Sequence, residues 1–158
     1  MQQTFKLISY IGLLVLSTAC LAYPKDWEYS HLGVPTKEHS KNELYDSKWK
    51  YYTWGYDESE FNIQMHRFDD DAPFPELIKT KAHLAFKVPN LKDAIKNRDV
   101  IWGPIESKPG LFVAMIKDPA TGMPIELLQT PLSKEEMIEK YHVPLHNQSH
   151  NYKRNIPT

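Results

Sequence analysis

The chain is poor in cysteine, with Cys20 the single one among its 158 residues. Cys20 lies within an N-terminal apolar run, so a chain cleaved after Ala22 would contain no cysteine, which excludes a disulfide framework and a thiol nucleophile. An excess of basic charge is also absent, because 19 Lys and Arg stand against 20 Asp and Glu. Without a basic stripe, no nucleic acid is expected as a partner. The partner we expect is a small molecule.

The first 22 residues have the layout of a secretory signal. One early charge, Lys6, precedes a largely apolar run over residues 7–22 that ends in small residues. Cys20 and Ala22 suit a signal peptidase cut after Ala22. Two alternatives stay open: "STAC" as a loose lipobox would make Cys20 the lipidated first residue of a lipoprotein, and a retained run is just long enough to span a membrane. The sequence therefore predicts an exported protein, periplasmic or secreted, that meets a membrane only through such an anchor.

One domain is expected over residues 23–130, because this length can bury one core. The second half reads as strands at "AHLAFKV", "DVIWGPIES", "GLFVAMIKDP" and "MPIELLQ", with a short helix at "LKDAIKNR". The first half reads as strands at "WEYSHLGVPT", "KWKYYTWGYDE" and "EFNIQMHRF", with no clear period between residues 37 and 51. Residues 131–158 are expected to form a C-terminal helix, begun by the capping box "SKEE", and a flexible tail.

A His-Leu pair occurs twice in the same local setting, at His31 and at His83. Two tandem units that each begin with this strand would explain the repeat. Aligning the ends of the units places Gln64 where Glu126 stands. The interval from His31 to Gln64 is shorter than that from His83 to Glu126 by about ten residues, so the first unit is expected to lack most of its helix.

The stretch "HLAFKVPNLKDAI" followed by "IKDPATGMPIELLQ" resembles the closing module of the vicinal oxygen chelate superfamily. That superfamily includes glyoxalase I, extradiol dioxygenases, fosfomycin-resistance enzymes and bleomycin-binding proteins. The resemblance covers most of residues 27–130 and implies an α+β fold, in which two tandem βαβββ modules over about residues 27–70 and 80–130 form a curved mixed sheet cup. The first module is expected to have a shortened or missing helix. Superfamily members close the cup within one chain or across a homodimer.

The resemblance also implies a metal site at the first and last strand of each module. The matching positions here are His31, Gln64, His83 and Glu126, with Glu126 also the candidate catalytic residue. Strand alternation agrees, since it places the two histidines and Glu126 away from the apolar layer, and Leu84 on the side that faces the helix. Two imidazoles and a carboxylate suit Fe, and further oxygen or amide ligands suit Mn, Ni or Zn.

His66, Tyr52 and Trp54 are candidates for the substrate pocket. His66 follows Gln64 on the same strand face and could replace it as a ligand. Tyr52 and Trp54 belong to a group of aromatic residues between positions 49 and 56. This group forms either a wall of the cup or the core of the shortened module.

The resemblance favours a metal-dependent lyase, isomerase or dioxygenase that acts on a small oxygenated substrate. Similarity to glyoxalase I is limited, because Gln64 stands where an acidic residue is usual, and the chain has only three arginines with which to bind glutathione. The alternative is a metal-free cup that sequesters an aromatic or cationic small molecule, as bleomycin-resistance proteins do.

Overall fold

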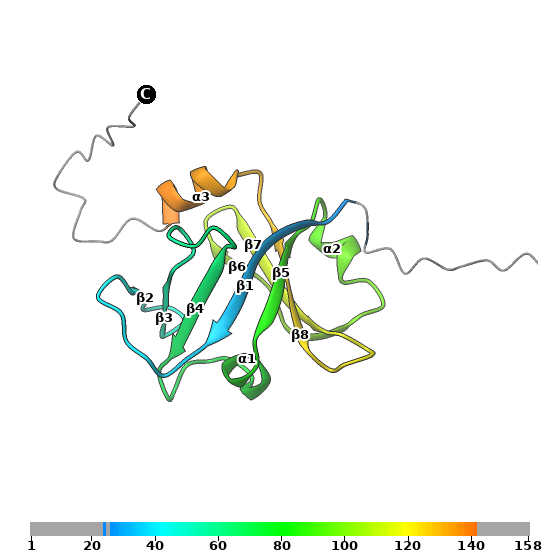
Figure 1. The fold of residues 1–158 in the computed structure, drawn as a ribbon. Helices are drawn as coiled ribbons and strands as arrows, with labels where there is room; N and C mark the ends of the chain where they lie inside the picture. Colours follow the sequence, from blue (N-terminus) through cyan, green and yellow to red (C-terminus); the bar gives the residue numbers. More distant parts are fainter. Residues whose placement is uncertain (1–23, 25, 142–158) are drawn as a thin grey trace, which may run out of the picture.

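Eight strands form one curved mixed sheet in the computed structural model, which describes residues 24 and 26–141 (Figure 1). The strands are β1 (Glu28–Pro35), β2 (Leu44–Asp46), β3 (Tyr51–Trp54), β4 (Ile63–Phe68), β5 (His83–Lys87), β6 (Asp99–Lys108), β7 (Leu111–Lys117) and β8 (Pro124–Gln129). The helices are α1 (Glu76–Thr80), α2 (Leu91–Ala94) and α3 (Lys134–Tyr141). The structure therefore has the α+β, cup-like architecture that the sequence predicts.

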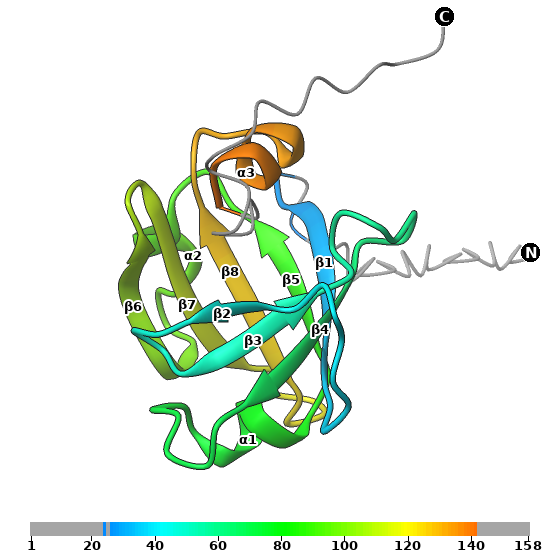
Figure 2. The same ribbon diagram turned by 90° about the vertical axis from the view of Figure 1, so that its left-hand side faces the viewer.

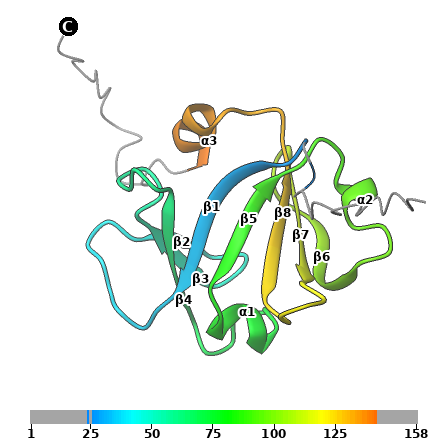
Figure 3. The same ribbon diagram turned by 45° about the vertical axis from the view of Figure 1, so that its right-hand side comes forward.

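The sheet has two four-stranded halves with the same pattern of pairing. Its strand order is β2-β3-β4-β1-β5-β8-β7-β6. In each half the first strand runs parallel to the last, β1 beside β4 and β5 beside β8. The antiparallel pair β1 and β5 joins the halves at the centre of the sheet (Figure 3). A helix, α2, follows the first strand of the second half, whereas the described chain has turns and bends but no helix between β1 and β2.

The short helix α2 covers the convex face of the second half. The Asn90 side chain accepts a hydrogen bond from the backbone N–H of Asp93 and so caps the helix. Leu91 and Ala94 then pack with a buried cluster formed by Val88, which follows β5, and by residues of β7 and β8: Ala114, Ile116 and Leu127. These residues alternate with those that face the cup, so burial of this layer turns the other side of each strand inward.

One expectation about this layer is wrong. Leu84 was expected to face the helix, but it is 43% exposed. The main contacts of α2 are with β7 and β8, so the helix does not cover the start of β5. Leu84 instead lies opposite Leu32 across the β1–β5 pair.

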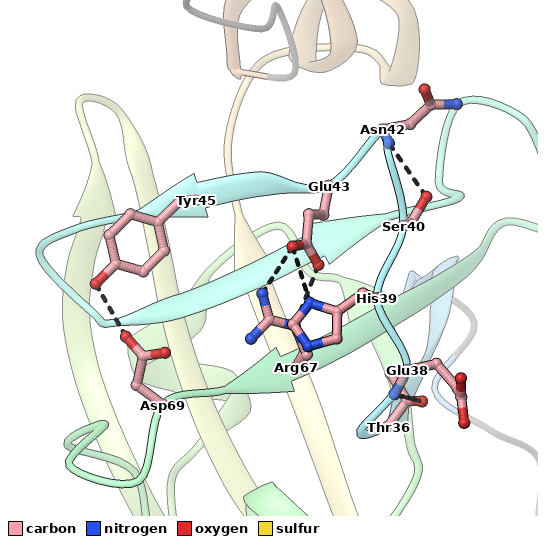
Figure 4. A network of polar contacts seen from close by, with 9 residues as sticks. All are labelled: Thr36, Glu38, His39, Ser40, Asn42, Glu43, Tyr45, Arg67 and Asp69. Atoms are coloured by element: carbon pink, nitrogen blue, oxygen red, sulfur yellow. Dashed lines mark hydrogen bonds and ion pairs between the residues drawn. The ribbon is translucent and has the colours of Figure 1, made fainter.

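The edge strand β2 has only three residues, in a segment for which the sequence predicts no regular structure. Two side-chain contacts attach this segment to β4 and the turn after it (Figure 4). Glu43 accepts two hydrogen bonds from Arg67, at 3.1 and 2.7 Å, and the Tyr45 hydroxyl donates to Asp69 at 3.0 Å. Tertiary contacts rather than a local pattern therefore determine this strand.

Replacing Arg67 by lysine should lower the free energy of unfolding by about 1 kcal/mol. The Arg67 and Glu43 side chains are only 12% and 17% exposed, and the guanidinium carbon lies 3.5 Å from the ring centre of Tyr52. A lysine keeps the charge but loses the two parallel hydrogen bonds and the stacked plane. Urea unfolding measures the effect. The control Arg98→Lys, whose guanidinium lies over Trp27, should cost less, and an equal loss in both variants would contradict this account.

The β2–β3 hairpin reaches across the cup to β6 (Figure 2). The Lys48 ammonium donates to the backbone oxygen of Glu106 at 3.2 Å, and Lys108 Nζ lies 3.0 Å from the Asp46 carboxylate. These contacts join the two edges of the curled sheet, so the concave face becomes the wall of a cavity.

Helix α3 lies across one end of the curled sheet, and α1 lies at the other end (Figures 1 and 3). The predicted capping box is present: Ser133 Oγ accepts from the backbone N–H of Glu136, whose carboxylate accepts from the N–H of Ser133. Met137 is buried and lines the cavity, and the Tyr141 hydroxyl donates to the Pro109 carbonyl at 2.8 Å. The helix therefore roofs the cup.

Two of the predicted segments lie outside the described residues. These are the signal segment, residues 1–22, and the tail after residue 141. None of the helices within the described part of the chain is long and apolar enough to cross a membrane.

Candidate metal centre

The four central strands of the sheet each place polar side chains on the concave face. His31 comes from β1, His83 from β5 and Glu126 from β8, while β4 contributes both Gln64 and His66. All five line one cavity of about 800 Å³. Because β4, β1, β5 and β8 are neighbours in the sheet, residues far apart in the sequence come to lie side by side.

The three histidines form a tight buried cluster. Their exposed fractions are 6% for His31, 7% for His66 and 3% for His83. One ring nitrogen from each lies within 4.8 Å of the others. Neutral imidazole is the commonest protein ligand of Zn and related metals. A cluster with these distances could hold a metal ion.

Glu126 supplies a negative charge next to this cluster. One of its carboxylate oxygens, Oε2, lies 3.1 Å from His83 Nε2 and 3.2 Å from His31 Nε2. Burial opposes ionisation of this carboxyl group, but the contacts with His31 and His83 outweigh it and hold the pKa of Glu126 well below its usual range. Glu126 is therefore an anion at neutral pH.

Two histidine nitrogens in the cluster are buried without a hydrogen-bond partner. His31 Nε2 is close to Glu126 but outside hydrogen-bonding geometry, and His83 Nδ1 has no partner among the described residues. An unpartnered buried polar atom costs about 1–3 kcal/mol. The cluster therefore has unused ligand capacity.

His66 is held neutral. Burial is the largest cause that lowers its pKa well below the usual value, and the positive charges of His83 and His31, when protonated, lower it further. Its Nε2 lies 3.1 Å from Gln64 Oε1, which accepts a hydrogen bond when that nitrogen carries the proton. Gln64 thus orients the His66 ring.

A glycine makes room for the His83 ring. Gly33 lies opposite His83 in the β1–β5 pair, and a β-carbon on Gly33 would lie 2.2 Å from His83 Cε1 and Nε2. That distance is far below van der Waals contact, so no other residue fits at position 33 with His83 in place. Gly33 therefore leaves space on β1 for the His83 ring of the neighbouring strand β5.

A second pair of residues orients His31. Ser30 Oγ lies 3.2 Å from His31 Nδ1, which leaves Nε2 as the nitrogen that faces Glu126. The His31 and Tyr56 rings pack edge to face, with their centroids 5.7 Å apart. Partners of this kind fix the tautomer and the ring plane of a metal-binding histidine.

The structure brings the four residues expected as ligands into one cavity, His31, Gln64, His83 and Glu126. His66, expected in the substrate pocket, also lines the cavity and belongs to the histidine cluster as well. The signal for it was its spacing of two residues from Gln64, which puts both side chains on one strand face.

The placement of Tyr52 and Trp54 in the pocket is wrong. Neither residue lines the cavity, whereas Tyr51 and Thr53 do. Thr53 pairs with His66 across β3 and β4, so the odd positions of β3 face the cup and the even ones face outward. Tyr52 packs against Tyr45 and under Arg67 on that outer side.

Comparison with known proteins leaves the family open. No family model matches the sequence, and no curated protein or solved structure shows significant similarity to the chain. The resemblance to the vicinal oxygen chelate superfamily therefore stays a proposal, and the site has to be interpreted from its own geometry.

Proposed function

We propose that this chain is an exported, glyoxalase-like protein of the vicinal oxygen chelate type, and a divalent-metal-dependent enzyme that acts on a small oxygenated substrate. The observation that carries the proposal is the buried cluster of His31, His66 and His83 beside the anionic Glu126. We interpret the two halves of the sheet as tandem βαβββ modules, the first without its helix. The reaction would be of the lyase, isomerase or dioxygenase type.

The residues present fit a divalent metal ion. Imidazole and carboxylate ligands suit Fe, Mn, Ni or Zn rather than Mg or Ca, which prefer all-oxygen sites. The unpartnered His31 Nε2, which lies beside Glu126, would gain a partner. Glu126 would balance part of the positive charge, which neutral imidazoles cannot do.

Within such a site the side chains have separable roles. A bound divalent ion supplies stabilisation of negative charge on a substrate oxygen. His31, His66, His83 and Glu126 would hold it, and Gln64 keeps the His66 ring in orientation. Glu126 is the anionic group that can accept a proton from the substrate. The apolar wall and the α3 roof limit the access of water.

Export is part of the proposal and rests on residues 1–22 alone. The apolar run with small residues at its end supports cleavage after Ala22 or lipidation of Cys20. The mass of the mature N-terminus tests this part, since a protein that keeps Met1 would contradict it.

Metal titration of the wild-type protein tests the central claim. We expect Mn, Fe(II), Ni or Zn, at a concentration of about 100 times its Kd, to raise the melting temperature by about 10 °C, because binding to the folded state alone stabilises it. Mg at the same concentration is the control and should have little effect. If none of the four metals shifts melting, the enzyme proposal fails.

A second candidate function is favoured by the size and lining of the cavity. A space of about 800 Å³ lined by aromatic rings is large enough to hold a small organic molecule without any metal. In that case the histidines and Glu126 form a polar hydrogen-bonded group, and the protein sequesters its ligand, as bleomycin-resistance proteins do.

A further inference from the structure

We infer that the cup contains a second subsite, beside the histidine cluster, that binds a flat aromatic group bearing an oxygen, with the Tyr51 hydroxyl as hydrogen-bond donor to that oxygen. The inference rests on the proposed function only in taking the cup as a small-molecule site. It names the class of substrate or ligand that enters.

Five aromatic rings form a continuous wall of the cavity: Trp49, Tyr51, Phe68, Phe74 and Trp102. Phe74 lies at the centre, with its ring centroid 4.9 Å from that of Trp102, 5.4 Å from Tyr51 and 5.2 Å from Phe68. Trp49 meets Trp102 edge to face at 5.2 Å. Rings that hold one another in this way are already ordered before a ligand arrives, so little entropy is lost on binding.

These rings are more than a packed core. Phe68, Ile78 and Met115 in the same cluster are buried, but Tyr51, Phe74 and Trp102 are only partly buried. All three line the cavity, so part of each ring faces open space inside the cup. Aromatic faces left open in a cavity favour a flat apolar ligand.

Tyr51 links this wall to the histidine cluster. Its ring centroid lies 5.9 Å from that of His66. Tyr51 lines the cavity, and its hydroxyl forms no hydrogen bond with any described residue. A phenol is neutral at pH 7 and can donate a hydrogen bond. A phenol that lines a cavity without a partner is suited to an oxygen on the ligand.

Calorimetric titration with three probes tests the inference: 2-naphthol, naphthalene, and decahydro-2-naphthol, which has the hydroxyl but no aromatic ring. EDTA is present throughout, so metal binding does not contribute. We expect 2-naphthol to bind at least about tenfold more tightly than its saturated analogue, because only the aromatic probe stacks on the wall. We also expect it to bind about three- to tenfold more tightly than naphthalene, because of the hydrogen bond.

Two matched variants locate the effect. Tyr51→Phe keeps the ring, so it should weaken 2-naphthol about three- to tenfold and leave naphthalene unchanged. Tyr52→Phe makes the same chemical change on the outer face of the same strand and should alter neither probe. If Tyr51→Phe binds 2-naphthol as the wild type does, the assignment of the donor is overturned.

The wild-type comparison decides the rest, even if the variant fails to fold. Equal binding of 2-naphthol and decahydro-2-naphthol would overturn the aromatic subsite. This outcome is separate from the metal proposal. Selectivity for the aromatic probe with no metal-dependent melting would defeat the enzyme proposal alone, and a metal response without that selectivity would defeat this inference alone.

Discussion

Glutamine in place of Glu126 should abolish the stabilisation of this protein by divalent metals. The substitution keeps the shape of the side chain but removes the anion that lies 3.1 Å from His83 Nε2 and 3.2 Å from His31 Nε2. Three neutral imidazoles would then face a doubly charged ion without compensation. We expect metal affinity to fall by at least about 100-fold, which is a loss of about 2.7 kcal/mol of binding free energy.

The measurement is the metal-dependent shift in melting temperature, compared with the control Glu60→Gln. Glu60 is an exposed carboxylate on the loop before β4, and its variant should respond to metal as the wild type does. Removal of His83 should abolish the shift as well, removal of His31 should reduce it strongly, and Gln64→Ala should be milder. An undiminished shift in Glu126→Gln would show that the ion binds elsewhere. If the wild type shows no shift, loss of a buried carboxylate should be neutral or stabilising.

Alanine at position 33 should disturb the site from the opposite strand. A β-carbon there would lie 2.2 Å from two atoms of the His83 ring, so the ring must leave its position or the strands must separate. The expected costs are about 2–3 kcal/mol of unfolding free energy and the loss of metal binding. Both come from one added methyl group, because the His83 ring can avoid it only by leaving its place beside Glu126 or by pushing the two central strands apart.

A double-mutant cycle separates this clash from a general intolerance of β1. With His83→Ala in the background, Gly33→Ala should cost much less, since the atoms that it meets are gone. Urea unfolding of the four proteins gives the coupling energy, expected to be at least about 1 kcal/mol. If the two costs are additive, the cost of Gly33→Ala comes from the strand itself and not from a clash with the His83 ring.

The second half of the fold could be predicted from sequence because its strands alternate clearly. In β8, Glu126 and Leu128 line the cavity while Leu127 packs on the convex side, as period-two patterning requires. The strand β2 could not be found in this way, because three residues carry no period and the contact of Glu43 with Arg67 is a tertiary one. The prediction for Leu84 failed because strand alternation shows which face of the sheet a residue is on. It does not show whether a helix packs against that part of the face.

The sequence predicts which side chains face the cup in strands of five residues or more. His31 and His83 lie on strands of eight and five residues, and their faces follow from the neighbouring apolar positions. The four-residue strand β3 is different, since it has aromatic residues on both faces and only its register with β4 shows that Tyr51 rather than Tyr52 faces the cup. His66 belongs to the metal cluster because its ring lies near His31 and His83 on other strands. A local sequence pattern cannot show that proximity.

The position of the cluster on four strands has a kinetic consequence. β1 must pair with β4 and with β5, and β5 with β8, before His31, His66, His83 and Glu126 face one another. Such pairings between distant segments form slowly, because each one closes a long loop. No single hairpin within residues 26–141 presents the complete set of side chains, so we expect the transition state for folding to contain little of it. A ligand held by all four strands would then slow the unfolding of the protein while leaving its folding rate nearly unchanged.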